Sequence, residues 1–559
     1  MKDFPWFKFY PKSVPQEVDV EAYSSVAGLF EESVQKYGKA VAYECMGKKI
    51  SFLEVDRLSK DFASYLQNEL KLQKGDRIAI QMPNLLQYPV AMFGALRAGL
   101  VVVNTNPLYT PHEMEHQFKD AGISAVVIVA NFASNLEEIL PKLDVKHIIL
   151  TEIGDLLGGF KGSIVNLAVK YIKKMVPAYN LPNAIKFNDA LSIGAHHNLT
   201  PVDLNLADTA YLQYTGGTTG VSKGAELTHG NIIANMQQIS AWMRPKLKEG
   251  EELVVTALPM YHIFALTVNC LAMLKIGAHN LLITNPRDMK AFCKDLRKHK
   301  FSVITGVNTL FNGLLNQESF RNLDFSYLKI SVGGGMAVQK YVAEKWSTVT
   351  GTPLAEGYGL TETSPVACCN PIDGTERIGT IGLPLPNTEV KIVDDEGNEL
   401  SNGEKGELCI KGPQVMKGYW NRPKETNDVM LGEWLKTGDI GIITDDGFIK
   451  IVDRKKEMIL VSGFNVYPNE VEDAIATHDK VMEVGVIGMP DEHSTEKVIA
   501  YVVPNDPSVT SAEIIKHCRE SLTNYKVPRE VHFVDELPKS NVGKILRRII
   551  KEDHIKKSA

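Results

Sequence analysis

The alternation of buried strand patterns with helical patterns, up to about residue 200, is the feature that most constrains the fold. Residues 75–84 (GDRIAIQMPN) are an apolar run that ends in a turn, and a helical pattern then closes at Gly99. The next run, 100–107, is apolar throughout, and 125–131 and 147–152 repeat the theme. Continuous apolar runs are typical of parallel strands covered on both faces. We therefore predict an α/β fold with mostly parallel sheets.

Composition limits the function classes. A chain of 559 residues is too long for one compact core. Its net charge of −6 gives no electrostatic footprint for nucleic acid, so no nucleic-acid partner is expected. The seven cysteines form no CxxC pair, which favours reduced thiols in a cytosolic protein. The N-terminus lacks the apolar core of a secretory signal, and no run is long enough to span a membrane. We expect a cytoplasmic protein whose membrane contact, if any, is peripheral and on the cytoplasmic face.

The texture changes after about residue 380, where short strands and Gly or Asn turns replace the long apolar runs. A hairpin is predicted over 444–454, with its turn at Asp446-Gly447. The charged stretch DRKKE (453–457) then precedes a compact α+β segment. We predict a large N-terminal domain over 1–453, built from two mostly parallel α/β sheets and a small β-rich subdomain. A connector follows at 454–457, then a small α+β domain over 458–559.

Residues 161–176 predict an amphipathic helix with lysines interleaved among its apolar positions. Two interpretations are open. The helix packs its apolar stripe on the domain and leaves its lysines in water, or it lies on an anionic membrane surface.

The strongest local motif is YTGGTTGVSKG, residues 214–224. Its glycines let the backbone approach a bulky anion, so that N–H groups can surround phosphate oxygens. Its threonines add hydroxyl donors, and Lys223 adds a positive charge. No Gly-Lys pair in the chain is followed by Ser or Thr, so this is not a Walker loop.

This loop resembles the signature of the adenylate-forming enzymes, which include acyl-CoA synthetases, luciferases and nonribosomal adenylation domains. The segments YGLTET (358–363), TGDIG (437–441), 453–472 and PKSNVGKILRR (538–548) follow in that family's order. Within the family, the chain closely resembles bacterial long-chain fatty acyl-CoA synthetases over essentially its whole length. The resemblance implies that ATP activates a fatty acid as an acyl adenylate, and that coenzyme A then takes the acyl group.

The resemblance also implies the site residues. Lys544, Glu362 and His262 would be catalytic, and Thr215 and Glu362 would contact Mg²⁺. The ring of Tyr358 would pack on adenine, and Asp439 would hold the ribose. The residues implied at the ATP site are Tyr214, Thr215, Gly216, Gly217, Thr218, Thr219, Gly220, Lys223, Gly333, Gly334, Gly335, Tyr358, Gly359, Thr361, Asp439 and Arg454.

The protein has to rearrange between the two half-reactions, because Lys544 would obstruct the thiol of coenzyme A in the second one. The resemblance implies that the mobile C-terminal domain, which carries Lys544, swings about a hinge at Lys456. Ser462 and Gly463 would then line the path of coenzyme A. Arg547 and Arg548 are expected to be solvated helix charges.

Four alternatives stay open. A fatty acyl-AMP ligase would deliver to a carrier protein, but no insertion that blocks the swing is evident. A nonribosomal module would continue into a carrier domain, and only a short tail follows Lys544 here. A luciferase-like oxygenase shares the ATP motifs. A catalytically inactive lipid-binding homologue should have lost charges that are present here. Chain length (medium-chain acids included), homodimer formation, and a role in breakdown by β-oxidation, lipid synthesis or uptake are also open.

Overall fold

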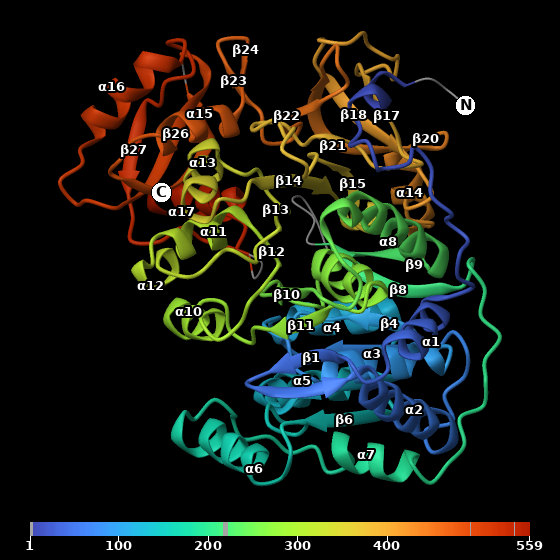
Figure 1. Ribbon diagram of the computed structural model, residues 1–559. Helices are drawn as coiled ribbons and strands as arrows, with labels where there is room; N and C mark the ends of the chain where they lie inside the picture. Colours follow the sequence, from blue (N-terminus) through green and yellow to red (C-terminus); the bar gives the residue numbers. More distant parts are fainter. Residues whose placement is uncertain (1–3, 216–221, 492, 541–542, 559) are drawn as a thin grey trace.

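The structure is a computed structural model that describes residues 4–215, 222–491, 493–540 and 543–558. Among these residues, two large mixed sheets form the body of the molecule (Figure 1). Both are mostly parallel, as predicted, and antiparallel strands lie at their edges. Helices cover the sheet faces, which explains why the central strands are apolar on both sides.

The first sheet has the order β16-β15-β14-β13-β12-β10-β11-β1-β2. Its strands are β1 (Val41–Cys45), β2 (Lys48–Ser51), β10 (Leu253–Thr256), β11 (His279–Leu282), β12 (Val303–Gly306), β13 (Ile330–Gly333), β14 (Leu354–Gly359), β15 (Val366–Cys369) and β16 (Leu383–Pro384).

The second sheet has the order β19-β9-β8-β4-β3-β5-β6-β7. Its strands are β3 (Arg77–Gln81), β4 (Val101–Asn104), β5 (Ala125–Val129), β6 (His147–Thr151), β7 (Ile185–Lys186), β8 (Thr209–Thr215), β9 (Lys223–Thr228) and β19 (Gly418–Tyr419).

Helices and short 3-10 or π turns connect and cover these sheets. They are η1 (Pro5–Phe9), α1 (Val26–Tyr37), α2 (Phe52–Asn68), α3 (Gln87–Arg97), α4 (Pro111–Ala121), η2 (Ala130–Phe132), α5 (Ala133–Ile139), η3 (Leu140–Lys142), α6 (Gly159–Leu167), η4 (Ala168–Ile172), α7 (Phe187–Gly194), α8 (His229–Met243), η5 (Arg244–Lys246), η6 (Ala265–Ala272), α9 (Met273–Lys275), α10 (Met289–Leu296), α11 (Asn308–Leu315), α12 (Glu318–Arg321), α13 (Lys340–Thr350), η7 (Thr361–Thr363) and α14 (Pro423–Val429).

A small antiparallel sheet follows, as the change of texture predicted. It contains β17 (Glu389–Val393), β18 (Gly406–Lys411), β20 (Met430–Leu431), β21 (Trp434–Ile443) and β22 (Ile449–Arg454). The predicted hairpin is confirmed: β21 pairs with β22, and Gly447 in the turn has φ +83°.

The C-terminal segment has its own sheet, drawn in orange and red in Figure 1. It contains β23 (Ile459–Val461), β24 (Phe464–Val466), β25 (Val481–Asp491), β26 (Thr495–Pro504) and β27 (Glu530–Phe533), with helices α15 (Pro468–Ala476), α16 (Ser511–Ser521) and α17 (Arg547–Ser558). Its apolar clusters run from Ile459 to Ile550 and are separate from the main core, which ends at Ile449.

The cysteines are free and buried, in agreement with the expectation of reduced thiols. Within the described ranges, no helix has both the length and the apolar character needed to cross a bilayer.

Candidate active site

The predicted phosphate loop connects two antiparallel strands. β8 ends at Thr215, β9 begins at Lys223, and these two residues pair directly. The hydroxyl of Ser222 donates a 2.8 Å hydrogen bond to the carbonyl of Thr215 and closes the base of the loop. Gly216, Gly217, Thr218, Thr219 and Gly220 lie outside the described residues. The described flanks therefore hold the two ends of the loop together.

The side chain of Tyr214 is used internally. Its hydroxyl donates a 2.8 Å hydrogen bond to Asp120, and Arg422 makes a 2.6 Å ion pair with the same carboxylate. The ring is buried beneath Gly224, where an added Cβ would lie 3.0 Å from it. The side chain of Tyr214 is thus occupied by Asp120 and by packing under Gly224.

A second group of glycines lies at the carboxyl ends of two neighbouring parallel strands, β13 and β14. A Cβ added to Gly334 would lie 2.9 Å from the carbonyl oxygen of Gly357. A Cβ added to Gly359 would lie 1.8 Å from the carbonyl oxygen of Pro365. Gly335 has φ +75°. Backbone this crowded admits only glycine. Ligands of open α/β sheets bind at this edge, so the predicted turn at Gly333–Gly335 is in a suitable position.

The predicted adenine and ribose residues form one hydrogen-bonded cluster. The Tyr358 hydroxyl donates a 2.5 Å bond to one carboxylate oxygen of Asp439, and Arg454 Nε lies 3.0 Å from the other. Asp439 and Arg454 are partners in register on β21 and β22. Burial raises the pKa of Tyr358 well above its usual value, so its hydroxyl remains a donor at neutral pH.

Glu362 and Lys223 meet at a residue that the sequence analysis missed, Tyr419. The Tyr419 hydroxyl donates a 2.7 Å hydrogen bond to Glu362, and the Lys223 ammonium lies 5.0 Å from the centroid of the Tyr419 ring. Tyr419 is on β19, which pairs with β9, and no local pattern marked it. The turn η7, which contains Thr361 and Glu362, packs against β8 and β9.

Lys544 is brought to this cluster from the end of the chain. Burial and the cationic Arg454 lower the pKa of Lys544 to about 8. The preceding residue, Gly543, has φ +84°, and its carbonyl accepts a 3.1 Å hydrogen bond from Thr309 on α11. The charge of Lys544 therefore interacts with those of Asp439 and Arg454, and its catalytic role in adenylation stays a prediction.

His262 lies close enough to Lys544 for their charges to interact. Burial, together with the positive charge of Lys544, lowers the pKa of His262 to about 4, so the imidazole is neutral at pH 7. Its Nδ1 accepts a 3.3 Å hydrogen bond from the Phe264 amide, which leaves the proton on Nε2. A neutral ring here can act as a hydrogen-bond donor.

The two neighbours of Lys456 are attached to different parts of the molecule. Lys455 forms ion pairs with Asp395 at 2.6 Å and Glu407 at 3.3 Å, both beside the small antiparallel sheet. Glu457 instead contacts Arg547 of α17. Lys456 itself is exposed in the turn between β22 and β23.

Ser462 and Gly463 form the turn of the β23–β24 hairpin, with φ +51° and +84°. Both residues are exposed. The structure does not bring this hairpin together with Lys544 at the ATP site.

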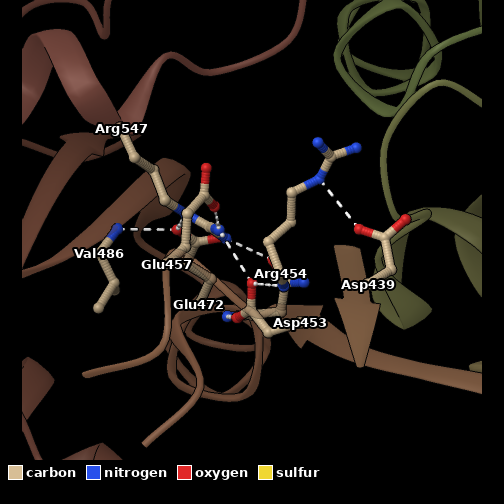
Figure 2. A network of polar contacts seen from close by, with 8 residues as sticks. Asp439, Asp453, Arg454, Glu457, Glu472, Val486 and Arg547 are labelled. Atoms are coloured by element: carbon tan, nitrogen blue, oxygen red, sulfur yellow. Dashed lines mark hydrogen bonds and ion pairs between the residues drawn. The ribbon is translucent and has the colours of Figure 1, made fainter. Parts of the chain in front are cut away.

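The prediction that Arg547 is a solvated charge is wrong. Its side chain is 14% exposed, and Figure 2 shows it among the carboxylates of Asp453, Glu457 and Glu472. Arg548, in contrast, is 64% exposed, as expected. Sequence reasoning missed Arg547 because a basic run gives no sign of which side chain turns inward.

Comparison with known proteins agrees with this fold. The family of AMP-binding enzymes matches residues 30–420, and the C-terminal domain of AMP-binding enzymes matches residues 470–544. The chain belongs to the AMP-binding enzyme family. It is 56% identical to the long-chain-fatty-acid–CoA ligase of Yersinia pestis, over 99% of this chain and 98% of that protein. It is 31% identical to mouse mitochondrial medium-chain acyl-CoA ligase ACSF2, over 89% of this chain and 81% of that protein.

Two solved structures support the fold. The anthranilate CoA ligase AuaEII in complex with anthranoyl-AMP has a TM-score of 0.86 at 23% identity, covering 97% of this chain and all of that one. ATP-bound MatB from Rhodopseudomonas palustris has a TM-score of 0.81 at 28% identity, covering 94% of this chain and 99% of that one.

Proposed function

We propose that this protein is an AMP-forming long-chain fatty acid–CoA ligase. It converts a fatty acid, ATP and coenzyme A into acyl-CoA, AMP and diphosphate through an acyl adenylate. The observation that supports the proposal is that Lys544 is close enough to Asp439 and Arg454 for their charges to interact, while Asp439 bonds to Tyr358 of β14 and Thr309 of α11 bonds to Gly543. The full-length likeness to a long-chain-fatty-acid–CoA ligase supports the substrate class.

In the first half-reaction, a carboxylate oxygen of the fatty acid attacks the α-phosphorus of ATP. The bond from that phosphorus to the bridging oxygen breaks, and diphosphate leaves. Negative charge gathers on the phosphoryl oxygens, and fixed cations stabilise it. Lys544 reaches those oxygens as a positive point charge on a flexible stem. Asp439 accepts hydrogen bonds from the ribose, and Tyr358 keeps its carboxylate oriented.

The residues at this site fit a magnesium ion. Glu362 offers a carboxylate and Thr215 a hydroxyl, on segments that pack together. The described part of the chain contains no cluster of three or more acidic, His or Cys ligands, and Mg²⁺ bound through substrate phosphates needs only one or two carboxylates. When bound, the ion would neutralise charge on the phosphates.

In the second half-reaction, the thiolate of coenzyme A attacks the acyl carbon, and AMP leaves. We propose that residues 458–559 swing about Lys456 between the two steps, with 1–453 as the large domain and 454–457 as the connector. The separate apolar clusters of the two parts support this division. So do the opposite attachments of Lys455 and Glu457. The swing would withdraw Lys544 and bring Ser462 and Gly463 to the thiol path.

The test is a substrate panel with purified protein, ATP, Mg²⁺ and coenzyme A. We expect oleate to support both diphosphate release and thioester formation, and Lys544→Ala to release little diphosphate. Diphosphate without thioester would indicate an acyl-AMP ligase, and preference for octanoate would indicate a medium-chain enzyme. No diphosphate with any acid would contradict the proposal.

We also propose that the protein binds the surface of an anionic membrane through α6 and the turn η4, at the edge of the molecule in Figure 1. The apolar side chains of this segment are exposed instead of packed on the domain: Phe160 (82%), Ile164 (48%), Leu167 (56%), Tyr171 (64%), Ile172 (81%) and Met175 (52%). Lys161, Lys170, Lys173 and Lys174 are exposed with them. Apolar side chains among lysines fit the interface of an anionic bilayer.

Vesicle sedimentation tests this contact. We expect binding to phosphatidylglycerol vesicles, and weaker binding to phosphatidylcholine vesicles or in high salt. Phe160→Ser with Ile172→Ser should abolish it. Ile378→Ser is the matched control, because Ile378 is 45% exposed on another part of the surface. Equal binding by both variants would contradict the proposal.

A further inference from the structure

Arg547 connects segments that lie on opposite sides of Lys456. Its guanidinium makes two hydrogen bonds to Glu472, at 2.8 and 2.6 Å, and contacts Glu457. Both carboxylates come after Lys456 in the chain, on the same side of it as Arg547. A further bond of 3.3 Å reaches Asp453, which precedes the connector. Figure 2 shows these contacts together.

Asp453 is held from both sides of the connector. Its side chain is fully buried. One oxygen accepts from the Arg454 amide at 2.7 Å, and the other accepts from the Asn469 amide, at the start of α15, at 2.8 Å. A buried carboxylate is stable only while such partners remain. The bonds to Arg547 and Asn469 depend on the present orientation of the C-terminal segment.

The same arginine is close in sequence to the catalytic lysine. The Ser540 amide donates a 2.7 Å hydrogen bond to the Lys544 carbonyl, and the Lys544 amide donates a 3.1 Å hydrogen bond to the Ser540 hydroxyl. Helix α17 begins shortly after, at Arg547. The bidentate contact with Glu472 on α15 fixes the first turn of α17, and therefore the end of the loop that carries Lys544. The contact with Asp453 fixes that loop relative to Arg454, the next residue along the chain.

We propose that Arg547 is a positioning residue that selects the adenylate-forming arrangement, by joining Asp453 to the helix that follows Lys544. The inference rests on the proposed alternation of the two domains. The contacts with Glu457 and Glu472 move with the C-terminal domain and persist during the swing. The contact with Asp453 breaks, so its strength sets how much of the enzyme has Lys544 in place.

The two half-reactions are measured separately in Arg547→Gln: diphosphate release from ATP and oleate, and thioester formation from supplied oleoyl adenylate and coenzyme A. We expect the first to fall at least about tenfold and the second to change less than about threefold, because the contact with the buried Asp453 exists only in the adenylate-forming arrangement. Arg548→Gln is the matched control, since Arg548 is exposed and its ion pair within the described residues is with Glu552, on its own helix. It should leave both rates unchanged.

A second variant acts from the other side of the connector. Asp453→Asn keeps an oxygen for the Asn469 amide but removes the charge that faces Arg547, so it should produce the same split with a smaller loss. Combining it with Arg547→Gln should add little, because Arg547→Gln already removes the contact between residues 453 and 547. Arg547→Lys should restore part of the loss. If Arg547→Gln does not fold, the Asp453→Asn comparison decides.

The distance between the two parts is a readout that does not need activity. The native cysteines are buried, so spin labels at Lys340→Cys and Lys556→Cys report selectively. With ATP bound, we expect one narrow distance distribution, and an added second distance in Arg547→Gln. An equal fall of both half-reaction rates in Arg547→Gln would overturn the inference. So would a ratio of the two rates and a distance distribution that both match those of the wild type. A wild type that forms no oleoyl adenylate would instead refute the proposed function.

Discussion

The hydroxyl of Thr309 donates a 3.1 Å hydrogen bond to the carbonyl of Gly543, the residue that precedes Lys544. Thr309 is on α11, which follows the central strand β12 of the first large sheet. The contact joins the tail loop to the body of the molecule beside the candidate active site. An added Cβ at Gly543 would lie 2.6 Å from the Thr309 hydroxyl oxygen.

Gly543→Ala should therefore reduce adenylation. The substitution adds this clash to a positive φ of +84°, which costs a residue with a side chain about 1–2 kcal/mol. We expect diphosphate release to fall by about tenfold or more, and thioester formation from supplied acyl adenylate to be largely spared. Gly403→Ala is the matched control, because Gly403 has φ +86° and open space around its Cβ position. Unchanged adenylation in Gly543→Ala would contradict this account.

The pH dependence of adenylation should report Lys544. Its pKa is lowered to about 8, and only the protonated amine stabilises phosphoryl charge. The kcat/KM for ATP should be constant below that pKa and fall about tenfold per pH unit above it. In Lys544→Arg the residual activity should lose this alkaline limb, because a guanidinium does not deprotonate there. If the alkaline fall in kcat/KM persists in Lys544→Arg, the titrating group is not Lys544.

Lys456→Pro should lower thioester formation more than adenylation, the reverse of the effect expected for Gly543→Ala. Proline fixes φ near −65° and restricts the preceding residue, so the connector loses rotational freedom. We expect thioester formation to fall by about an order of magnitude more than diphosphate release. Lys456→Ala keeps the backbone free and should behave as wild type in both assays. Equal losses in the two steps would argue against rotation at this residue.

Tyr358→Phe should weaken ATP binding. The hydroxyl bonds to the carboxylate of Asp439 at 2.5 Å, and a hydrogen bond to a charged group contributes about 1.5–3 kcal/mol. We expect the KM for ATP to rise about tenfold or more, because Asp439 loses the bond that orients it. The KM for oleate should not change, because Tyr358 is assigned to the nucleotide and not to the fatty acid. Steady-state kinetics with each substrate varied in turn measures this. A rise confined to oleate would place Tyr358 elsewhere in the site.

Local sequence determined the chemistry of the candidate site. Gly334 and Gly359 lie where a Cβ would meet neighbouring backbone, and Gly335 has a positive φ, so the glycines in the sequence mark these positions. Apolar runs such as 100–107 and 125–131 predicted the parallel strands, because burial on both faces requires them. The order of the motifs then carried the family resemblance, which predicted Lys544, Asp439 and Glu362 together.

Only the tertiary structure decided which charges are buried and which apolar stripes are covered. Arg547 and Arg548 are adjacent and alike in sequence, yet one turns into a cluster of carboxylates and the other into water. Periodicity placed an apolar stripe on the helix that begins at Gly159, but it could not show that most of its large side chains stay exposed. Both outcomes depend on segments distant in sequence, whose approach is set by packing and not by local conformation.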